Sequence, residues 1–114
     1  MSKRSLQFLL ADMLDCLDKT VLVIEGLTYD SFLKDIKAFH ACLSLVAIMG
    51  EAAAQAIRHQ PNLPDTLPWH HIRGMRNRLV HEYFDVDSAT LWMVVSEEFP
   101  KLRAPLIALQ ASLQ

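Results

Sequence analysis

The sequence has few of the residues that build scaffolds other than a packed core. Its 114 residues include 2 cysteines, 3 glycines and 5 prolines. Cys16 and Cys42 are too few for a disulfide framework and lack metal-ligand spacing, so we expect buried, reduced thiols. Low glycine and proline contents exclude a collagen-like or disordered chain. With 52% hydrophobic residues, we expect one folded domain spanning residues 1–114.

Long uncharged runs are also lacking. The run over residues 38–50 has 13 residues and ends at Glu51, whereas a membrane-spanning helix needs about 20. Asp12 and Asp15 interrupt the apolar stretch near the N-terminus, which argues against a signal peptide. These features predict a cytoplasmic protein with no membrane contact. The formal net charge of -2 argues against a protein that coats nucleic acid by bulk attraction.

Motifs for metal or nucleotide chemistry are absent as well. The sequence has no Glu-x-x-His pair, and His81-Glu82 does not begin a His-Glu-x-x-His motif because residue 85 is aspartate. No glycine-rich phosphate loop is present. We therefore expect neither a metal nor a cofactor.

Helical spacing recurs along the chain and predicts an all-α fold. Apolar residues recur at intervals of three and four residues from Leu6 to Ile24, which predicts a first helix, and Gly26 predicts its end. Thr28, Asp30 or Ser31 could cap a second, strongly apolar helix that runs through Ile57. Small residues at positions 50–56 would let a neighbouring helix approach this second helix closely.

Proline separates the remaining elements. Residues 60–68 hold three of the five prolines and predict a loop, with Pro68 in the first turn of a third helix. Asp87 or Ser88 could cap a fourth helix, which Pro100 and Pro105 should kink or restart. Short connections between four to five helices predict an antiparallel bundle.

The segment from Pro68 to Asp87 is the most informative part of the sequence. Between Glu51 and Glu82 the chain carries four arginines but one acid, Asp65, and four of the five histidines lie between His59 and His81. Arginine presents a planar fork of donors that suits phosphate oxygens. The nearly neutral chain is therefore locally cationic, which fits either a solvated basic face or a phosphate site.

A helical wheel separates two faces of the third helix. The apolar face contains Ile72, Met75, Leu79 and Val80. The opposite polar face contains His70, Gly74, Asn77 and His81, flanked by Arg73 and Arg78. This polar face could seat an RNA backbone or a helix of a partner subunit.

Two polar residues do not fit this wheel, because Arg76 and Tyr83 project near the apolar face. Arg76 and His81 also lie about 140° apart on an ideal helix. A joint site therefore requires the helix to end near His81, or a second subunit.

The motif region resembles a known family. Residues 76–81 have the R-x4-H pattern of HEPN-domain ribonucleases, and Tyr83 extends it to R-x4-H-x-Y, as in the HepT-like toxins. Further matches in the same order are Met49-Gly50-Glu51-Ala52, Pro68-Trp69 with Gly74-Met75, Leu91-Trp92 and Phe99-Pro100. R-x4-H alone occurs often by chance, but the combined string is specific.

The resemblance implies the toxin of a toxin–antitoxin pair, an endoribonuclease that needs no metal and forms its cleft from two copies of the chain. His81 would act as base or acid, and Arg76 would hold the phosphate. Asn77, Arg73 and Arg78 would support the site or contact RNA. The resemblance also implies an MntA-like minimal nucleotidyltransferase as antitoxin, which silences the toxin by transferring AMP to Tyr83.

Several residues have less specific interpretations. Glu51 is either a surface carboxylate or a buried partner of Arg76, Arg76 can be an amphipathic stem with a solvated head, and Trp69 and Trp92 are packing residues. An alternative function is a HEPN binding module that docks a nucleotidyltransferase and binds nucleotide or RNA without cutting. A third is a helical interaction protein without any RNA.

Overall fold

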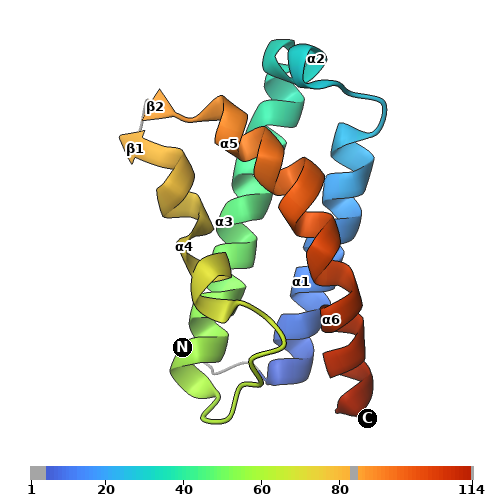
Figure 1. Cartoon of the computed structure of the whole chain (residues 1–114), viewed down its shortest axis with the longest axis vertical. Helices are drawn as coiled ribbons and strands as arrows, with labels where there is room; N and C mark the ends of the chain where they lie inside the picture. Colours follow the sequence, from blue (N-terminus) through green and yellow to red (C-terminus); the bar gives the residue numbers. More distant parts are fainter. Residues whose placement is uncertain (1–4, 83–84, 114) are drawn as a thin grey trace.

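The computed structural model describes residues 5–82 and 85–113, with the backbone alone over residues 80–82. Figure 1 shows the main helices side by side, with the chain reversing direction from each to the next. They are α1 (Leu6–Ile24), α3 (Ile36–His59), α4 (Trp69–Leu79) and α6 (Phe99–Ser112). The predicted all-α antiparallel bundle is confirmed.

Two short helices and a π-helical segment complete the helical structure. They are α2 (Tyr29–Lys34), α5 (Ser88–Met93) and η1 (Val94–Glu98). The segments α5, η1 and α6 follow one another without a break. Pro105 lies inside α6 and does not restart the helix there.

Side-chain caps begin these helices where the sequence predicts them. Thr28 caps α2 by accepting the Ser31 N–H, and Asp87 caps α5 by accepting the Thr90 N–H. The second predicted helix is interrupted, however, because Asp35 has an extended backbone and caps α3 with its own side chain. The predicted turn at Gly26 is also confirmed, since its φ is +78°.

The predicted third helix is shorter than expected. It ends at Leu79, and the chain then forms an antiparallel hairpin of β1 (Val80–Glu82) and β2 (Asp85–Val86). The sequence shows no strand here, because two- and three-residue strands are too short for a period of two to be seen. The hairpin is closed by the Asp87 N–H, which donates to the Leu79 carbonyl oxygen over 2.8 Å.

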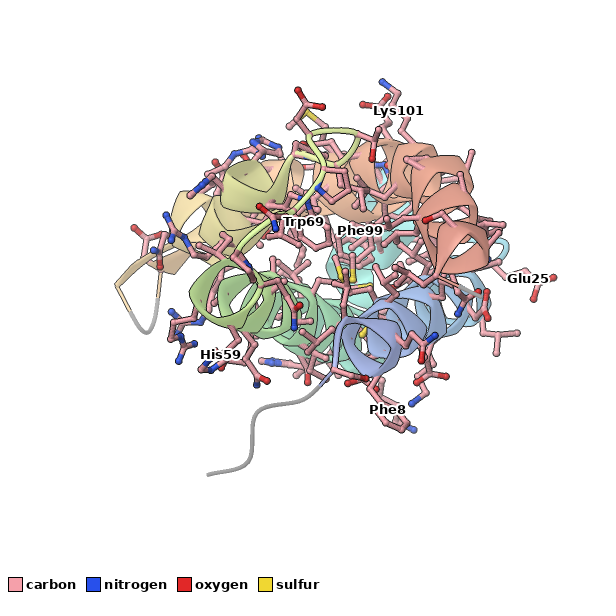
Figure 2. The ribbon with its side chains drawn as sticks, turned by 90° about the horizontal axis from the view of Figure 1, so that it is seen from below. Phe8, Glu25, His59, Trp69, Phe99 and Lys101 are labelled. Carbon is pink, nitrogen blue, oxygen red and sulfur yellow. The ribbon has the colours of Figure 1, made fainter. Side chains whose placement is uncertain are left out.

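The core lies between α1, α3, α4 and the continuous helical segment formed by α5, η1 and α6. Figure 2 looks along the bundle from below and shows Trp69 and Phe99 pointing into its interior. Trp69 also donates its indole N–H to the Pro64 carbonyl oxygen over 2.9 Å, and Trp92 packs on Phe32 with ring centroids 5.0 Å apart. Both tryptophans are therefore packing residues, as predicted.

Helix α3 is the central helix of the bundle, packed against α1 on one side and α4 on the other. Its length and composition alone would also allow it to cross a membrane. A core helix meets the same criterion, and 44% of the relevant window is buried inside the protein. Cys16 and Cys42 are both buried free thiols, as expected.

Candidate functional site

Helix α4 is held on the bundle by one apolar face. Ile72, Met75 and Leu79 are almost completely buried, which confirms the predicted apolar stripe. The side chain of Val80 lies outside the described residues. The helix begins where the Pro68 carbonyl oxygen accepts the Ile72 N–H over 2.9 Å, so Pro68 stands just before the first turn. Trp69 is buried on the same side, so most of the polar side chains of α4 are left exposed.

The outward face of α4 is basic and carries no acid. Its exposed residues include His70, Arg73, Arg76 and Asn77. Within the described part of the chain, neither Arg73 nor Arg76 makes an ion pair or a side-chain hydrogen bond. Both guanidinium groups are therefore available to an anion such as a phosphate.

Arg76 is exposed, although the helical wheel places it near the apolar stripe. A long side chain can leave the edge of such a stripe and carry its charge into water, which is the less specific interpretation of Arg76 given above. Glu51 does not reach it. The Glu51 carboxylate is exposed, accepts from Gln55 over 3.5 Å and lies 3.7 Å from Arg58 on the same helix. Glu51 is thus a surface carboxylate.

The end of α4 changes the relation between Arg76 and His81. The wheel assumed a helix through residue 81, but His81 stands in β1, two residues after the helix ends. The 140° separation therefore does not apply, and one of the two conditions for a joint site is met. The side chain of His81 and the whole of Tyr83 lie outside the described residues, so their predicted roles stay predictions.

Arg78 differs from the other two arginines of α4. Its guanidinium contacts Glu98 of η1 through two nitrogen–oxygen pairs, Nη1–Oε1 at 3.2 Å and Nη2–Oε2 at 3.3 Å. His71, two turns earlier on α4, places Nε2 2.7 Å from the same Oε1. Sequence reasoning missed Glu98, because no spacing rule links residues 20 positions apart in different elements.

Glu98 is ionised in this cluster. Partial burial raises the pKa of the carboxyl group, but hydrogen bonds from His71 and Arg78, together with the charge of Arg78, outweigh this effect. The net result is a pKa below the usual value of a glutamate. Glu98 and Arg78 therefore form a charged pair at neutral pH.

Two further features surround α4. An open pocket of about 570 Å³ lies at its N-terminal end, between the 60–68 loop and residues such as Ile57, Trp69 and His70. This pocket is at the opposite end of α4 from the R-x4-H histidine. In the described ranges 5–82 and 85–113, no group of three His, Cys, Asp or Glu side chains is arranged to hold a metal ion.

Comparison with known proteins bears directly on this basic helix. Residues 13–109 match the profile of the family described as "Ribonuclease HepT-like", and this span includes all of α4 and the hairpin. The chain belongs to the HepT-like ribonuclease family. The resemblance that the motif indicates is therefore confirmed. Membership of this family supports RNA cleavage as the activity of the chain.

Individual relatives agree with this membership. The chain is 31% identical over 101 residues to "Probable ribonuclease HepT" of Thermococcus cleftensis, covering 89% of this chain and 92% of that protein. It is 29% identical over 103 residues to "Putative RNase MJ1380" of Methanocaldococcus jannaschii, covering 90% and 94%. No solved structure matches the chain.

Proposed function

We propose that this HepT-like protein is the toxin of a toxin–antitoxin pair, a cytoplasmic endoribonuclease that acts as a homodimer without a metal. One observation carries the proposal: Arg76 is exposed without a carboxylate partner among the described residues, on a helix that ends two residues before His81. Such an arginine can bind a phosphate, and a histidine just beyond the helix can move a proton close to it.

The proposed reaction follows from the chemistry of RNA. A base removes the proton of the 2′-hydroxyl, whose oxygen attacks the adjacent phosphorus. The bond to the 5′-oxygen breaks, an acid protonates that oxygen, and the products are a cyclic phosphate and a 5′-hydroxyl end. His81 supplies the base or the acid, Arg76 stabilises charge at the phosphate, and Asn77 orients the substrate or His81.

The dimer supplies what one chain lacks. One copy of the motif offers a single histidine, whereas the reaction needs both a base and an acid. Two copies across an axis bring a second histidine and double the basic face of α4. The exposed Arg73 lies one turn before Arg76 and extends this face toward flanking phosphates.

Cleavage by purified protein tests the activity. We expect RNA to be cut in the presence of EDTA, and His81→Ala and Arg76→Ala each to slow cutting by about 10²–10⁴-fold. Arg58→Ala is the matched control, because Arg58 is an exposed arginine on α3 that already has Glu51 beside it. Intact RNA after incubation with the parent protein would overturn the proposal, and RNA binding without products would favour the non-cleaving module.

Mixing two inactive variants tests the composite site. If Arg76 of one chain works with His81 of its partner, a heterodimer of Arg76→Ala and His81→Ala keeps one Arg76–His81 pair across the axis, with one histidine instead of two. We then expect part of the activity to return when the two variants are mixed and allowed to exchange subunits. If both residues act within one chain, every site in the heterodimer has one defect and the mixture stays inactive.

The antitoxin part of the proposal concerns Tyr83. Its hydroxyl would attack the α-phosphate of ATP, form a phosphate ester with AMP and release pyrophosphate, which places bulk and negative charge beside the cleft. We expect an MntA-like nucleotidyltransferase and ATP to raise the intact mass by one adenylyl group and to stop cleavage. Tyr83→Phe should show no mass increase, and an unchanged mass for the parent protein would remove this step.

A further inference from the structure

The charged pair of Arg78 and Glu98 joins the C-terminal end of α4 to the continuous helical segment formed by α5, η1 and α6. Arg78 lies one residue before the end of α4, and Glu98 is the last residue of η1. Their side chains are 35% and 23% exposed, less than the 59% and 63% of the surface pair Arg58–Glu51. A partly buried two-pronged contact is more rigid than a surface ion pair.

His71 completes the contact and fixes its hydrogen bonding. Its Nε2 is 2.7 Å from Glu98 Oε1 and 3.0 Å from Arg78 Nη1. A carboxylate oxygen only accepts, so the 2.7 Å contact is a hydrogen bond in the tautomer whose Nε2 carries the proton and donates to Glu98; the 3.0 Å contact with Arg78 Nη1 is then a close approach of two donors. Glu98 then accepts from both α4 side chains, which makes it the shared acceptor of the cluster.

The backbone of η1 sets the direction of Glu98. The Phe99 N–H donates to the Val94 carbonyl oxygen five residues earlier, so this turn contains one residue more than an α-helical turn. An extra residue rotates the residues that follow by about 100° relative to those that precede. A π segment inside a longer helix is frequently found at functional sites.

We infer that Glu98 is a positioning residue: it fixes the last turn of α4 through Arg78 and withholds this arginine from the RNA. The inference rests on the proposed function and goes beyond it. Arg73 and Arg76, three residues apart on one side of α4, are left as the phosphate-binding arginines of that helix. On this inference Arg78 supports the site and does not contact RNA, which selects one of the two roles that the sequence predicted for it.

Glu98→Gln tests both parts, because it removes the charge and keeps the shape of the side chain. Release of Arg78 adds one phosphate contact. We expect RNA affinity to rise on the order of fivefold and the slope of log K against log salt to steepen by about one. The freed end of α4 no longer holds the motif in register, so kcat should fall about tenfold. A purely structural role would weaken binding and catalysis together.

Matched variants separate charge from position. Glu97→Gln removes the same charge at the preceding, exposed residue, which has no partner in the described structure, and it should leave both kcat and the salt slope unchanged. Arg78→Gln should lower kcat without steepening the salt slope. The exchange Arg78→Glu with Glu98→Arg should restore kcat toward the parent value.

The outcomes distinguish this inference from the proposed function. If the parent protein cleaves RNA and Glu98→Gln behaves like Glu97→Gln, the inference is overturned and the function stands. If the parent does not cleave RNA, the function fails, and a double-mutant cycle on thermal unfolding still measures the coupling of Arg78 and Glu98. Absence of coupling would overturn the inference by that route, and circular dichroism verifies that each variant folds.

Discussion

Gly50 of α3 lies directly against the backbone of Arg73 in α4. A Cβ atom at position 50 would be 3.3 Å from the Arg73 carbonyl oxygen and 3.5 Å from that of Ile72. The two helices therefore meet backbone to backbone at this point, as the small residues at positions 50–56 predicted. This contact fixes the distance between α4 and α3 at this point. The side chains of Arg73 and Arg76 are exposed on α4.

Gly50→Ala should destabilise the fold, although alanine is the better helix former. Helix propensity alone favours alanine by roughly 0.8–1 kcal/mol. The new methyl group must push back a backbone oxygen, and overpacking of this kind costs roughly 1–3 kcal/mol. We expect a net loss of about 1 kcal/mol in the free energy of unfolding, measured by urea titration. A gain in stability would show that α4 can move away from α3.

Gly74→Ala should have the opposite effect. Apart from its chain neighbours and the backbone of its own helix, no atom of the described residues lies within 4 Å of a Cβ at this position, and its backbone needs no positive φ. The variant should gain roughly 0.5–1 kcal/mol in the same titration from helix propensity. If it also loses RNA cleavage or dimer formation, then Gly74 lies where RNA or the partner helix approaches. Unchanged cleavage and unchanged dimer formation would contradict that use of the polar face.

Arg73→Ala should weaken RNA binding in a salt-dependent way. Arg73 is exposed and has no carboxylate partner in the ranges that the structure describes. Losing one phosphate contact should reduce the slope of log K against log salt by about 1 for every RNA sequence tested. Fluorescence anisotropy over a salt series measures this slope. Arg58→Ala is the control, because Arg58 already has Glu51 beside it in the parent protein. Equal slopes for the two variants would place Arg73 outside the RNA interface.

Acid should remove the contribution of Glu98 to stability. Burial raises the pKa of Glu98 in the folded chain, but hydrogen bonds from His71 and Arg78 and the charge of Arg78 lower it by more. Folding therefore favours the ionised carboxylate. The contribution is therefore present above the unfolded pKa, near 4.5, and is lost as the pH falls through the lower folded value. Thermal unfolding of the parent and Glu98→Gln should differ at pH 7 and converge as the pH falls below the lowered pKa of the folded chain. A difference that persists in acid would contradict this reasoning.

The two cysteines should be unreactive in the folded protein. Burial raises the pKa of Cys16 and of Cys42 from 9.0 to about 11, so both thiols stay protonated at neutral pH. Because the folded state holds these protons more tightly, stability should fall as the pH rises above about 9. Iodoacetamide should label neither cysteine at pH 7.5 until denaturant is added, as measured by intact mass. Rapid labelling without denaturant would show that the core opens locally.

Local signals predicted most of the helices correctly. The caps at Thr28 and Asp87 and the turn at Gly26 depend on groups within a few residues of one another, so sequence alone contains them. The burial of Ile72, Met75 and Leu79 follows from helical spacing. The break at Asp35 was missed, because a continuous apolar pattern does not show where an extended residue interrupts it.

The hairpin after Leu79 was missed for a different reason. A helical wheel drawn to His81 assumes that the helix continues to that residue. In the structure the Leu79 carbonyl oxygen instead accepts from the Asp87 N–H, eight residues further along the chain, and the helix ends at Leu79. The same hydrogen bond brings the end of α4 beside the start of α5. Its partners are too distant in sequence for a wheel to relate them.

The sequence by itself determined the helical class, the caps, the basic composition of α4 and membership of the HepT-like family. These properties depend on residue type and short-range spacing. Tertiary structure alone decided which arginines of α4 remain available, because Glu98 neutralises Arg78 from another element while Arg73 and Arg76 stay exposed. It also decided where α4 ends. Both outcomes depend on contacts between residues far apart in the chain, which a one-dimensional pattern does not contain.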